Sequence, residues 1–143
     1  MFDEPVRSVM QRRNILKVLP DIVVRKAAEL MAKRNVGAVL VVEDARLVGI
    51  LTERDIAFRV VARGLDPQTT RVADVMTSAP DTVDPDKPFG YALVRMHQGG
   101  FRHLPVIKDG AVIGIVSARN AMDPTLEEFQ HEARRRKRYQ EQS

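Results

Sequence analysis

Two short segments of the chain combine hydroxyl, carboxylate or amide, and guanidinium groups at the same spacing. The first reads Gly49-Ile50-Leu51-Thr52-Glu53-Arg54-Asp55, and the second reads Gly114-Ile115-Val116-Ser117-Ala118-Arg119-Asn120. Each segment follows an aliphatic run and precedes a helical pattern, so each is predicted to be a strand-to-helix junction. Chemistry that both halves of the chain share should be found at these two junctions.

The first junction has the groups that a nucleotide needs. Thr52 and Asp55 are neighbours on one face of the predicted helix start, while Arg54 lies about 100° around the helix axis. A hydroxyl beside a carboxylate can hydrogen-bond to the vicinal hydroxyls of a ribose. The helix N-terminus and a guanidinium favour a phosphate. The second junction offers the same set, with one charge fewer, in Ser117, Arg119 and Asn120.

The same residues also have a purely structural interpretation. Thr52 is a good helix N-cap, and Asp55 three residues later can complete a variant of the capping box. Gly49 and Gly114, just upstream, allow either a close approach of backbone or ligand or a β-bulge. Both interpretations stay open on the sequence alone.

The two junctions belong to an internal repeat with an offset of 65 residues. Ten identical pairs fall within 37 aligned positions, beginning with Val18 opposite Val83. Upstream, the pattern Val6-x-x-Val9-Met10 recurs as Val72-x-x-Val75-Met76. The repeat predicts two units of about 60 to 65 residues that pack together, because a unit of this size rarely buries a full core alone.

Each unit predicts the order helix, strand, strand, helix. The first helices have apolar positions Val24, Ala27, Ala28 and Met31, and again Phe89, Ala92, Leu93 and Met96. The predicted hairpin strands are 39–42 with 47–51, and 104–107 with 111–116. The second helices run from Glu53 to about Arg63, and from about Ala118 to a limit at Pro124. Because the strands are almost continuously apolar, we expect sheets covered on both faces, with helices of both units sharing the interface.

Composition excludes several classes of protein. A chain of 143 residues with 44% apolar and 29% charged residues can build a core, and it has no apolar run long enough to span a bilayer. The absence of cysteine excludes disulfides and thiolate metal sites. No signal-peptide pattern follows Met1, so we expect a cytoplasmic protein.

The basic excess of the chain lies in its tail. There are 23 basic and 19 acidic residues, and five of the basic ones are residues 134–138, which leaves 18 against 19, or −1, elsewhere. From about residue 125 the tail is predicted to be helical, with acidic residues first and basic residues last, as the helix dipole favours. A solvated terminal helix is one interpretation; docking on a partner, RNA, DNA or an anionic surface is the other, although Tyr139 alone gives little for base stacking.

Further motifs complete a resemblance to a known family. Val18-x-Pro20 and Val83-x-Pro85 open the two units, and Gly100-Phe101-Arg102-His103-Leu104-Pro105-Val106 begins the second hairpin. With the Val-x-x-Val-Met openers and the Gly-x-x-Thr/Ser-x-x-Asp/Asn junctions, residues 6–122 resemble two cystathionine beta-synthase (CBS) domains, the tandem pair called a Bateman module. The resemblance implies an α/β (α+β) fold of two β-α-β-β-α repeats that pack through their sheets about a pseudo-twofold axis, with two ligand clefts between them.

The resemblance also implies ligands and site residues. Members of the family bind adenosine compounds such as AMP, ADP, ATP, S-adenosylmethionine or cyclic dinucleotides, and they regulate a partner without catalysis. By position, Thr52 with Asp55, and Ser117 with Asn120, would hold ribose, while Arg54, Arg102, His103 and Arg119 would reach phosphates. Val18, Thr82 and Val83 would line adenine. Gly37 and Ala38 are candidate ligand-binding residues too, because they occupy the positions of Arg102 and His103 in the first unit. Since they carry no charge there, we expect one good cleft and one weak or empty one.

We therefore expect a stand-alone CBS pair that senses an adenine nucleotide, needs no cofactor, forms a homodimer through its helices and signals to a partner protein. The expected divisions are residues 1–70 and 71–124 for the two repeats and 125–143 for the tail. The alternative is a nucleic-acid-binding or structural adaptor that uses the basic tail and has vestigial clefts.

Catalysis and metal binding have little support in the sequence. The three histidines, His97, His103 and His131, lack zinc-site spacing, and there is no phosphate-binding loop of the Walker type. His103 is either a capping or packing group at the head of a strand or a phosphate contact that gains charge near pH 6.5.

Overall fold

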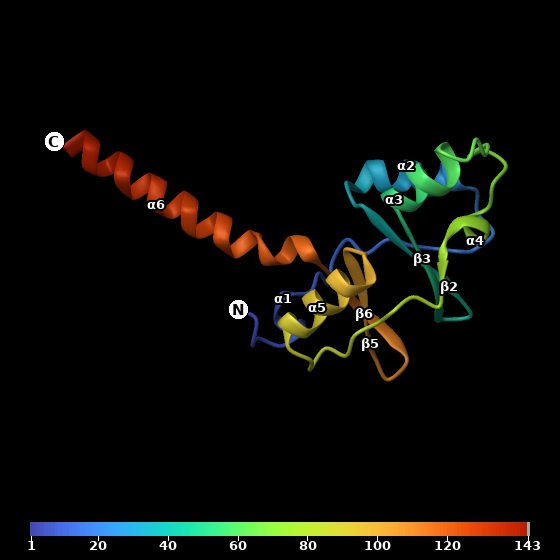
Figure 1. The fold of residues 1–143 in the computed structure, drawn as a ribbon, viewed down its shortest axis with the longest axis horizontal. Helices are drawn as coiled ribbons and strands as arrows, with labels where there is room; N and C mark the ends of the chain where they lie inside the picture. Colours follow the sequence, from blue (N-terminus) through green and yellow to red (C-terminus); the bar gives the residue numbers. More distant parts are fainter. Residues whose placement is uncertain (143) are drawn as a thin grey trace.

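The structure is a computed structural model that describes residues 1–142, and within them the side chains of all residues except 123–128 and 142. Two mixed α/β units lie side by side, and one long helix projects from the second (Figure 1). Within the described part of the chain, none of the helices has the length and the apolar run that crossing a bilayer requires.

The first repeat contains a four-stranded sheet in the order β1-β2-β3-β4. Its strands are β1 (Lys17–Val18), β2 (Ala38–Glu43), β3 (Arg46–Thr52) and β4 (Thr77–Ser78), with β1 parallel to β2 and the other pairs antiparallel. Helix α2 (Val24–Arg34) packs its buried residues against this sheet, as the apolar spacing predicts. After β3 the chain forms α3 (Glu53–Asp55) and then one π-helical segment, η1 (Ile56–Val61), in place of the continuous α-helix expected there.

The second repeat follows the same plan with fewer strand residues. Helix α5 (Phe89–Gly99) precedes the hairpin of β5 (His103–Lys108) and β6 (Ala111–Ser117), and a 3-10 helix, η2 (Ala118–Ala121), comes next. Single bridges from Val83 to Val106 and from Gln11 to Ile115 stand where the first repeat has β1 and β4. Pro124 lies in the first turn of the long helix α6 (Asp123–Gln142), where its missing N–H costs least.

Both hairpins turn through two residues with positive φ. Asp44 and Ala45 have φ of 51° and 62°, and Asp109 and Gly110 have φ of 51° and 81°. Two such residues in succession are characteristic of the type I′ turn, whose twist matches that of the flanking strands. The hairpins predicted from sequence are therefore confirmed, with strand ends displaced by at most one residue.

The two short opening helices are exchanged between the repeats. Helix α1 (Val6–Val9) packs into the core of the second repeat beside α5, while α4 (Val72–Val75) packs into the core of the first. Equivalent backbone bonds hold each of them: Val6 N donates to Lys87 O at 2.8 Å, and Val72 N donates to Ile22 O at 2.8 Å. The division of the chain at residue 70 follows the repeat in the sequence, whereas each core includes a segment from the other half.

Methionines of the exchanged openers explain the two junction glycines. A Cβ on Gly114 would lie 2.7 Å from Met10 Sδ and 3.0 Å from Gln11 O, and a Cβ on Gly49 would collide with Met76 Sδ. In both hairpins the register also shifts next to the residue that pairs with the glycine. A close approach and a strand irregularity thus occur together, and what approaches is a packed methionine.

The two sheets face each other across an apolar layer. Ala38, Leu40 and Ile50 of the first sheet form a buried cluster with Ile115 and Val112 of the second. The expectation that helices of both units share this interface is therefore wrong, because α2 and α5 lie on the outer faces, in the separate cores of their own repeats. The packing through sheets that the family resemblance implies is present.

Candidate functional site

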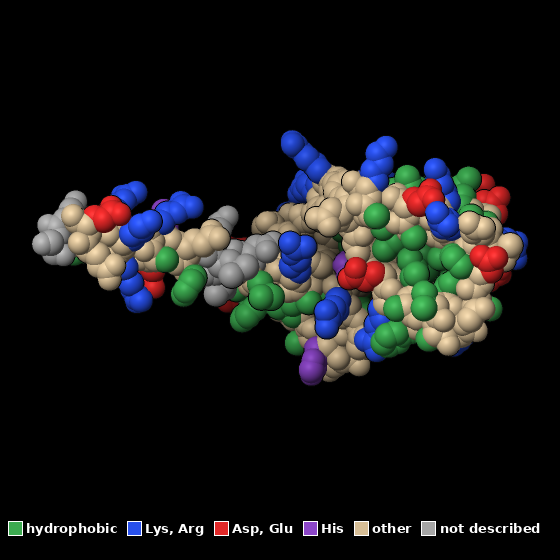
Figure 2. Space-filling view, turned by 90° about the horizontal axis from the view of Figure 1, so that it is seen from above, with side chains coloured by type: hydrophobic (Ala, Val, Ile, Leu, Met, Phe, Trp, Pro, Cys, Tyr) green, Lys and Arg blue, Asp and Glu red, His purple; other side chains and the backbone are tan. Residues whose placement is uncertain are grey.

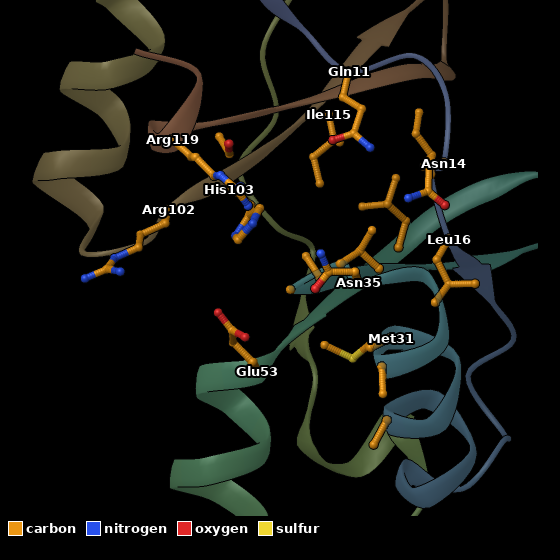
Figure 3. A pocket seen from close by; sticks show the side chains of 18 of the residues that line it. Gln11, Asn14, Leu16, Met31, Asn35, Glu53, Arg102, His103, Ile115 and Arg119 are labelled. Atoms are coloured by element: carbon orange, nitrogen blue, oxygen red, sulfur yellow. The ribbon is translucent and has the colours of Figure 1, made fainter. Parts of the chain in front are cut away.

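A cavity of about 600 Å³ opens between the two repeats, where β2 and β5 begin and β3 and β6 end (Figure 3). Six of the thirteen residues predicted from sequence line it: Gly37, Ala38, Arg102, His103, Ser117 and Arg119. The other seven lie outside its lining: Val18, Thr52, Arg54, Asp55, Thr82, Val83 and Asn120. Both repeats contribute to the walls, so their relative position determines the shape of the cavity.

The second repeat supplies a basic wall. Arg102 comes directly before β5, His103 is the first residue of β5, and Arg119 lies in η2, so two arginines and one histidine line the cavity from neighbouring elements. Burial lowers the pKa of the half-buried His103 below 6.5; Glu53 raises this pKa, and Arg102 lowers it further. The positive charge of the wall at pH 7 therefore comes from the two arginines.

The first repeat supplies a wall that is mostly apolar and amide. Met31 and Asn35 of helix α2 and its C-cap lie on this side, together with Leu16 and Asn14 of the segment before β1 (Figure 3). Asn35 takes the left-handed conformation, with φ of 54°, which ends α2 and turns the chain toward Gly37. An apolar surface with a few amide groups suits a flat heterocycle.

Glu53 is a cavity residue that the sequence motif did not single out. It occupies the variable position between Thr52 and Arg54, and its side chain points into the cavity (Figure 3). The repeat offset contains the signal that could have found it, because the equivalent residue of the second repeat is Ala118. A charge present in one copy and absent from the other marks a difference between the two clefts.

Both strand-to-helix junctions form capping boxes. Thr52 Oγ1 accepts from Asp55 N at 3.2 Å, and Thr52 N donates to Asp55 Oδ2 at 2.9 Å. In the second repeat Ser117 N donates to Asn120 Oδ1 at 2.8 Å, and the same box closes. The structural interpretation of these residues is thus confirmed, while their role toward a ribose stays a prediction.

Arg59 extends the first capping box toward the exchanged helix α4. Its Nε lies 3.7 Å from Asp55 Oδ1, and its Nη1 donates to the carbonyls of Val75 and Met76, each at 3.1 Å. These two carbonyls are at the C-terminal end of α4, which has no later helical turn to bond them. Asp55 is therefore linked through one guanidinium to the segment that joins the two repeats.

The remaining predicted residues have structural surroundings. Val18 pairs with Val41 and is buried in the first core, and Val83 is buried in the second. Thr82, next to Val83, is exposed. Arg54 reaches from the first repeat to the second, as expected for a residue that points toward the partner unit.

The family model for the CBS domain matches residues 6–62 and 72–124 of this chain. The chain belongs to the CBS domain family and contains two copies of the domain, the arrangement of a tandem CBS pair. This assignment confirms the resemblance inferred from the repeated motifs, and it agrees with the mixed helix and strand architecture.

Two relatives and two solved structures illustrate the similarity. The meiotically up-regulated gene 70 protein of Schizosaccharomyces pombe is 36% identical over 149 residues, which cover 87% of this chain and 20% of that protein. The CBS domain-containing protein CBSCBSPB2 of Arabidopsis thaliana is 47% identical over 91 residues, which cover 63% of this chain and 17% of that protein. The chain thus spans a fifth or less of the length of these two relatives.

The solved structures match over most of their length. A conserved protein of Pyrococcus horikoshii superposes with a TM-score of 0.81 at 27% identity, covering 87% of this chain and 94% of that one. A CBS domain protein of Pyrobaculum aerophilum, solved in complex with AMP, superposes with a TM-score of 0.73 at 28% identity, covering 81% of this chain and 88% of that one.

Among the described residues of the present chain, no group of three His, Asp or Glu side chains is placed to hold a metal ion.

Proposed function

We propose that this chain is a regulatory module that binds an adenine nucleotide in the cavity between its two repeats and passes the binding state to a partner protein. The observation that carries the proposal is the cavity itself, with a basic wall of Arg102 and Arg119 opposite a largely apolar wall. A phosphate fits the guanidiniums, and an adenine fits the apolar side. The Pyrobaculum aerophilum relative, solved in complex with AMP, supports the same ligand class.

The roles of the junction residues are part of this proposal. Ser117 lies at the cavity, and its partner Asn120 is three residues away, so this pair would hold the ribose of a ligand in the cavity described here. Thr52 and Asp55 would hold ribose in the pseudo-symmetric cleft, where Arg54 would reach the phosphate. Val18, Thr82 and Val83 would contact adenine through backbone and apolar groups. Because Arg102 and His103 of the second repeat correspond to the uncharged Gly37 and Ala38 of the first, we expect one cleft to bind the nucleotide more strongly than the other.

A thermal-shift assay with AMP, ADP, ATP and S-adenosylmethionine tests the proposal. A ligand at about 100 times its Kd stabilises the folded state by about 2.7 kcal/mol, which raises the melting temperature by several degrees for a chain of this length. Arg102→Ala combined with Arg119→Ala should abolish the shift, whereas Arg63→Ala, an exposed arginine outside the cavity lining, should leave it unchanged. Melting that no adenosine compound alters at millimolar concentration contradicts the proposal.

The module is proposed to act without catalysis and without a required cofactor, in the cytoplasm, as a homodimer. Support for the dimer comes from apolar side chains that are exposed on helices of both repeats. Phe58 and Val61 on η1 are 58% and 71% exposed, and Val94 on α5 is 54% exposed. Light scattering on the full chain tests this arrangement, and Phe58→Asp with Val61→Asp should then yield monomers.

Helix α6 carries the alternative function, a nucleic-acid or anionic contact. Arg134, Arg135, Arg136, Lys137 and Arg138 are all exposed on a helix that projects from the body (Figures 1 and 2). Removal of residues 123–143 should abolish RNA and DNA binding if the tail has this role, and it should leave the AMP-induced thermal shift in place. The two functions are therefore separable in one set of variants.

A further inference from the structure

We propose that Glu53 limits the negative charge of the ligand, so that the cavity takes a nucleoside monophosphate in preference to the di- or triphosphate. This inference rests on the proposed function and names the ligand class of that same cavity. Glu53 is the one acidic side chain among the described residues that line it. Nothing in the shared junction motif requires an acid at this position, because the second repeat has Ala118 there.

The two repeats place opposite charges within one equivalent pair of hydrogen-bonded residues. In the first repeat Glu53 N donates to Gly37 O at 3.0 Å, and in the second Ala118 N donates to Arg102 O at 3.0 Å. These are equivalent bonds, since both pairs are related by the offset of 65 residues. The pair Gly37 and Glu53 carries a negative charge, whereas the pair Arg102 and Ala118 carries a positive one.

The absence of a side chain on Gly37 leaves the space that the carboxylate of Glu53 occupies. A Cβ on Gly37 would lie 3.1 Å from Glu53 Oε1, so the carboxylate lies against this stretch of backbone. From there it points into the cavity on the side opposite His103 (Figure 3). A phosphate bound by the basic wall would therefore have the carboxylate as its neighbour across the cavity.

The charged side chains that line the cavity have a small positive sum, which favours a ligand with few negative charges. Arg102 and Arg119 contribute two positive charges, His103 is mostly neutral at pH 7, and Glu53 contributes one negative charge. A single terminal phosphate carries about −1.5 to −2 at this pH and can be matched by the two guanidiniums. The further phosphates of ADP and ATP would bring additional negative charge toward Glu53, and like charges at close range disfavour binding.

Isothermal titration of the full chain with AMP, ADP and ATP in the absence of divalent cations tests this role. The native chain should bind AMP more tightly than ATP. Glu53→Gln keeps the shape of the side chain and should improve the affinity for ATP by about tenfold, the change that about 1.4 kcal/mol produces, while the affinity for AMP changes less than about threefold. Glu53→Ala, which installs the residue of the second repeat, should act in the same direction.

Glu43→Gln removes the same charge at the far end of β2 and should change neither affinity. Because screening weakens charge repulsion, raising the salt concentration should narrow the difference between AMP and ATP in the native chain and not in Glu53→Gln. Tighter binding of ATP than of AMP by the native chain, or equal changes in both affinities on Glu53→Gln, overturns the role of Glu53 and leaves the nucleotide site intact. Failure of all three nucleotides to bind overturns the proposed function and this inference together.

Discussion

The guanidinium of Arg54 crosses from the first repeat to the second, where its Nη1 donates to the carbonyl of Gly100 at 3.4 Å. Gly100 is the left-handed residue, with φ of 72°, that ends helix α5. The same guanidinium lies 4.9 Å from the centroid of the Phe58 ring. A cation at the C-terminus of a helix interacts favourably with the helix dipole. A phosphate that bound Arg54 would replace a contact between the repeats by a contact with ligand, which would link occupancy to the position of one repeat against the other.

Loss of either member of the first capping box should destabilise the fold. Thr52→Ala and Asp55→Ala should each cost about 1 kcal/mol of unfolding free energy, because each removes a partner of one reciprocal pair. The double variant should cost less than the sum, since the second change removes what the first has already broken. Urea denaturation measures all three. If the losses of unfolding free energy in the two single variants summed to that of the double variant, the reciprocal bonding of the capping box would be contradicted. Ser117→Ala and Asn120→Ala are the matched variants in the second repeat.

The exchanged openers predict effects that cross from one half of the chain to the other. Val6→Ala should cost about 2 kcal/mol, because Val6 is fully buried, and the loss should fall on the second core. Hydrogen exchange should then speed up in α5 and β5 more than in α2 and β2. Val72→Ala should give the reverse pattern. If amide hydrogen exchange became faster only in the repeat nearest in sequence to the substituted residue, the packing of α1 and α4 in the opposite repeats would be contradicted.

Gly114 of β6 and Gly37, which precedes β2, should differ in how well they accept a methyl group. Gly114→Ala should cost about 1 to 3 kcal/mol, since the new Cβ would meet Met10 Sδ at 2.7 Å and the backbone oxygen of Gln11 at 3.0 Å. Gly37→Ala should cost much less, because its new Cβ would meet only the flexible end of Glu53. Thermal denaturation of both variants measures the difference. Equal losses would mean that the space around the glycine is not the deciding factor.

His103 should make the stability of the fold depend on pH in a defined window. Its pKa is lowered on folding, mainly by burial, so the unfolded chain takes up the proton first as the pH falls below about 6.5. The unfolding free energy of the native chain should therefore fall, relative to that of His103→Gln, as the pH decreases from about 6.5 toward the lowered pKa, and the difference should level off below that pKa. Above pH 6.5 the unfolding free energies of the two proteins should run parallel. Parallel behaviour across the whole range from pH 5 to 8 would contradict this effect.

Substitution of Glu53 gives a second test of the pH dependence that we attribute to His103. Its carboxylate raises the pKa of His103 and so opposes the effect of burial, while Arg102 works in the other direction. Glu53→Gln should therefore lower the pKa of His103 in the folded chain further, so that the loss of stability still begins near pH 6.5 but becomes larger and extends to lower pH. The measurement is the same denaturation series, in the absence of nucleotide, so that titration of a ligand phosphate does not contribute.

The sequence predicted those parts of the fold that depend on local patterns. The hairpins follow from aliphatic runs on either side of Asp44 and Asp109, and helices α2 and α5 follow from apolar residues at helical spacing. The exchange of α1 and α4 was not predictable in this way, because Val6 and Val72 have the same local pattern wherever they pack. Which of two equivalent cores receives each opener depends on the three-dimensional path of the chain.

The candidate site was predicted in part for a related reason. Arg119 stood out because it matches Arg54 at the repeat offset, and Arg102 and His103 stood out through the family motif that begins the second hairpin. Glu53 did not stand out, because the motif treats its position as variable, and only the fold shows that its side chain enters the cavity. Motif residues such as Asp55 were found easily, but their side chains close a capping box and lie outside the cavity lining.

Helix α6 begins, in the sequence, shortly after two residues that line the cavity. Ser117 and Arg119 line the cavity, and the 20-residue helix begins at Asp123, four residues after Arg119. Twenty helical residues extend about 30 Å, so a tilt of about 10° at η2 would carry the far end of the helix through about 5 Å. A small adjustment around a bound molecule would thus become a displacement that another macromolecule could register at a distance.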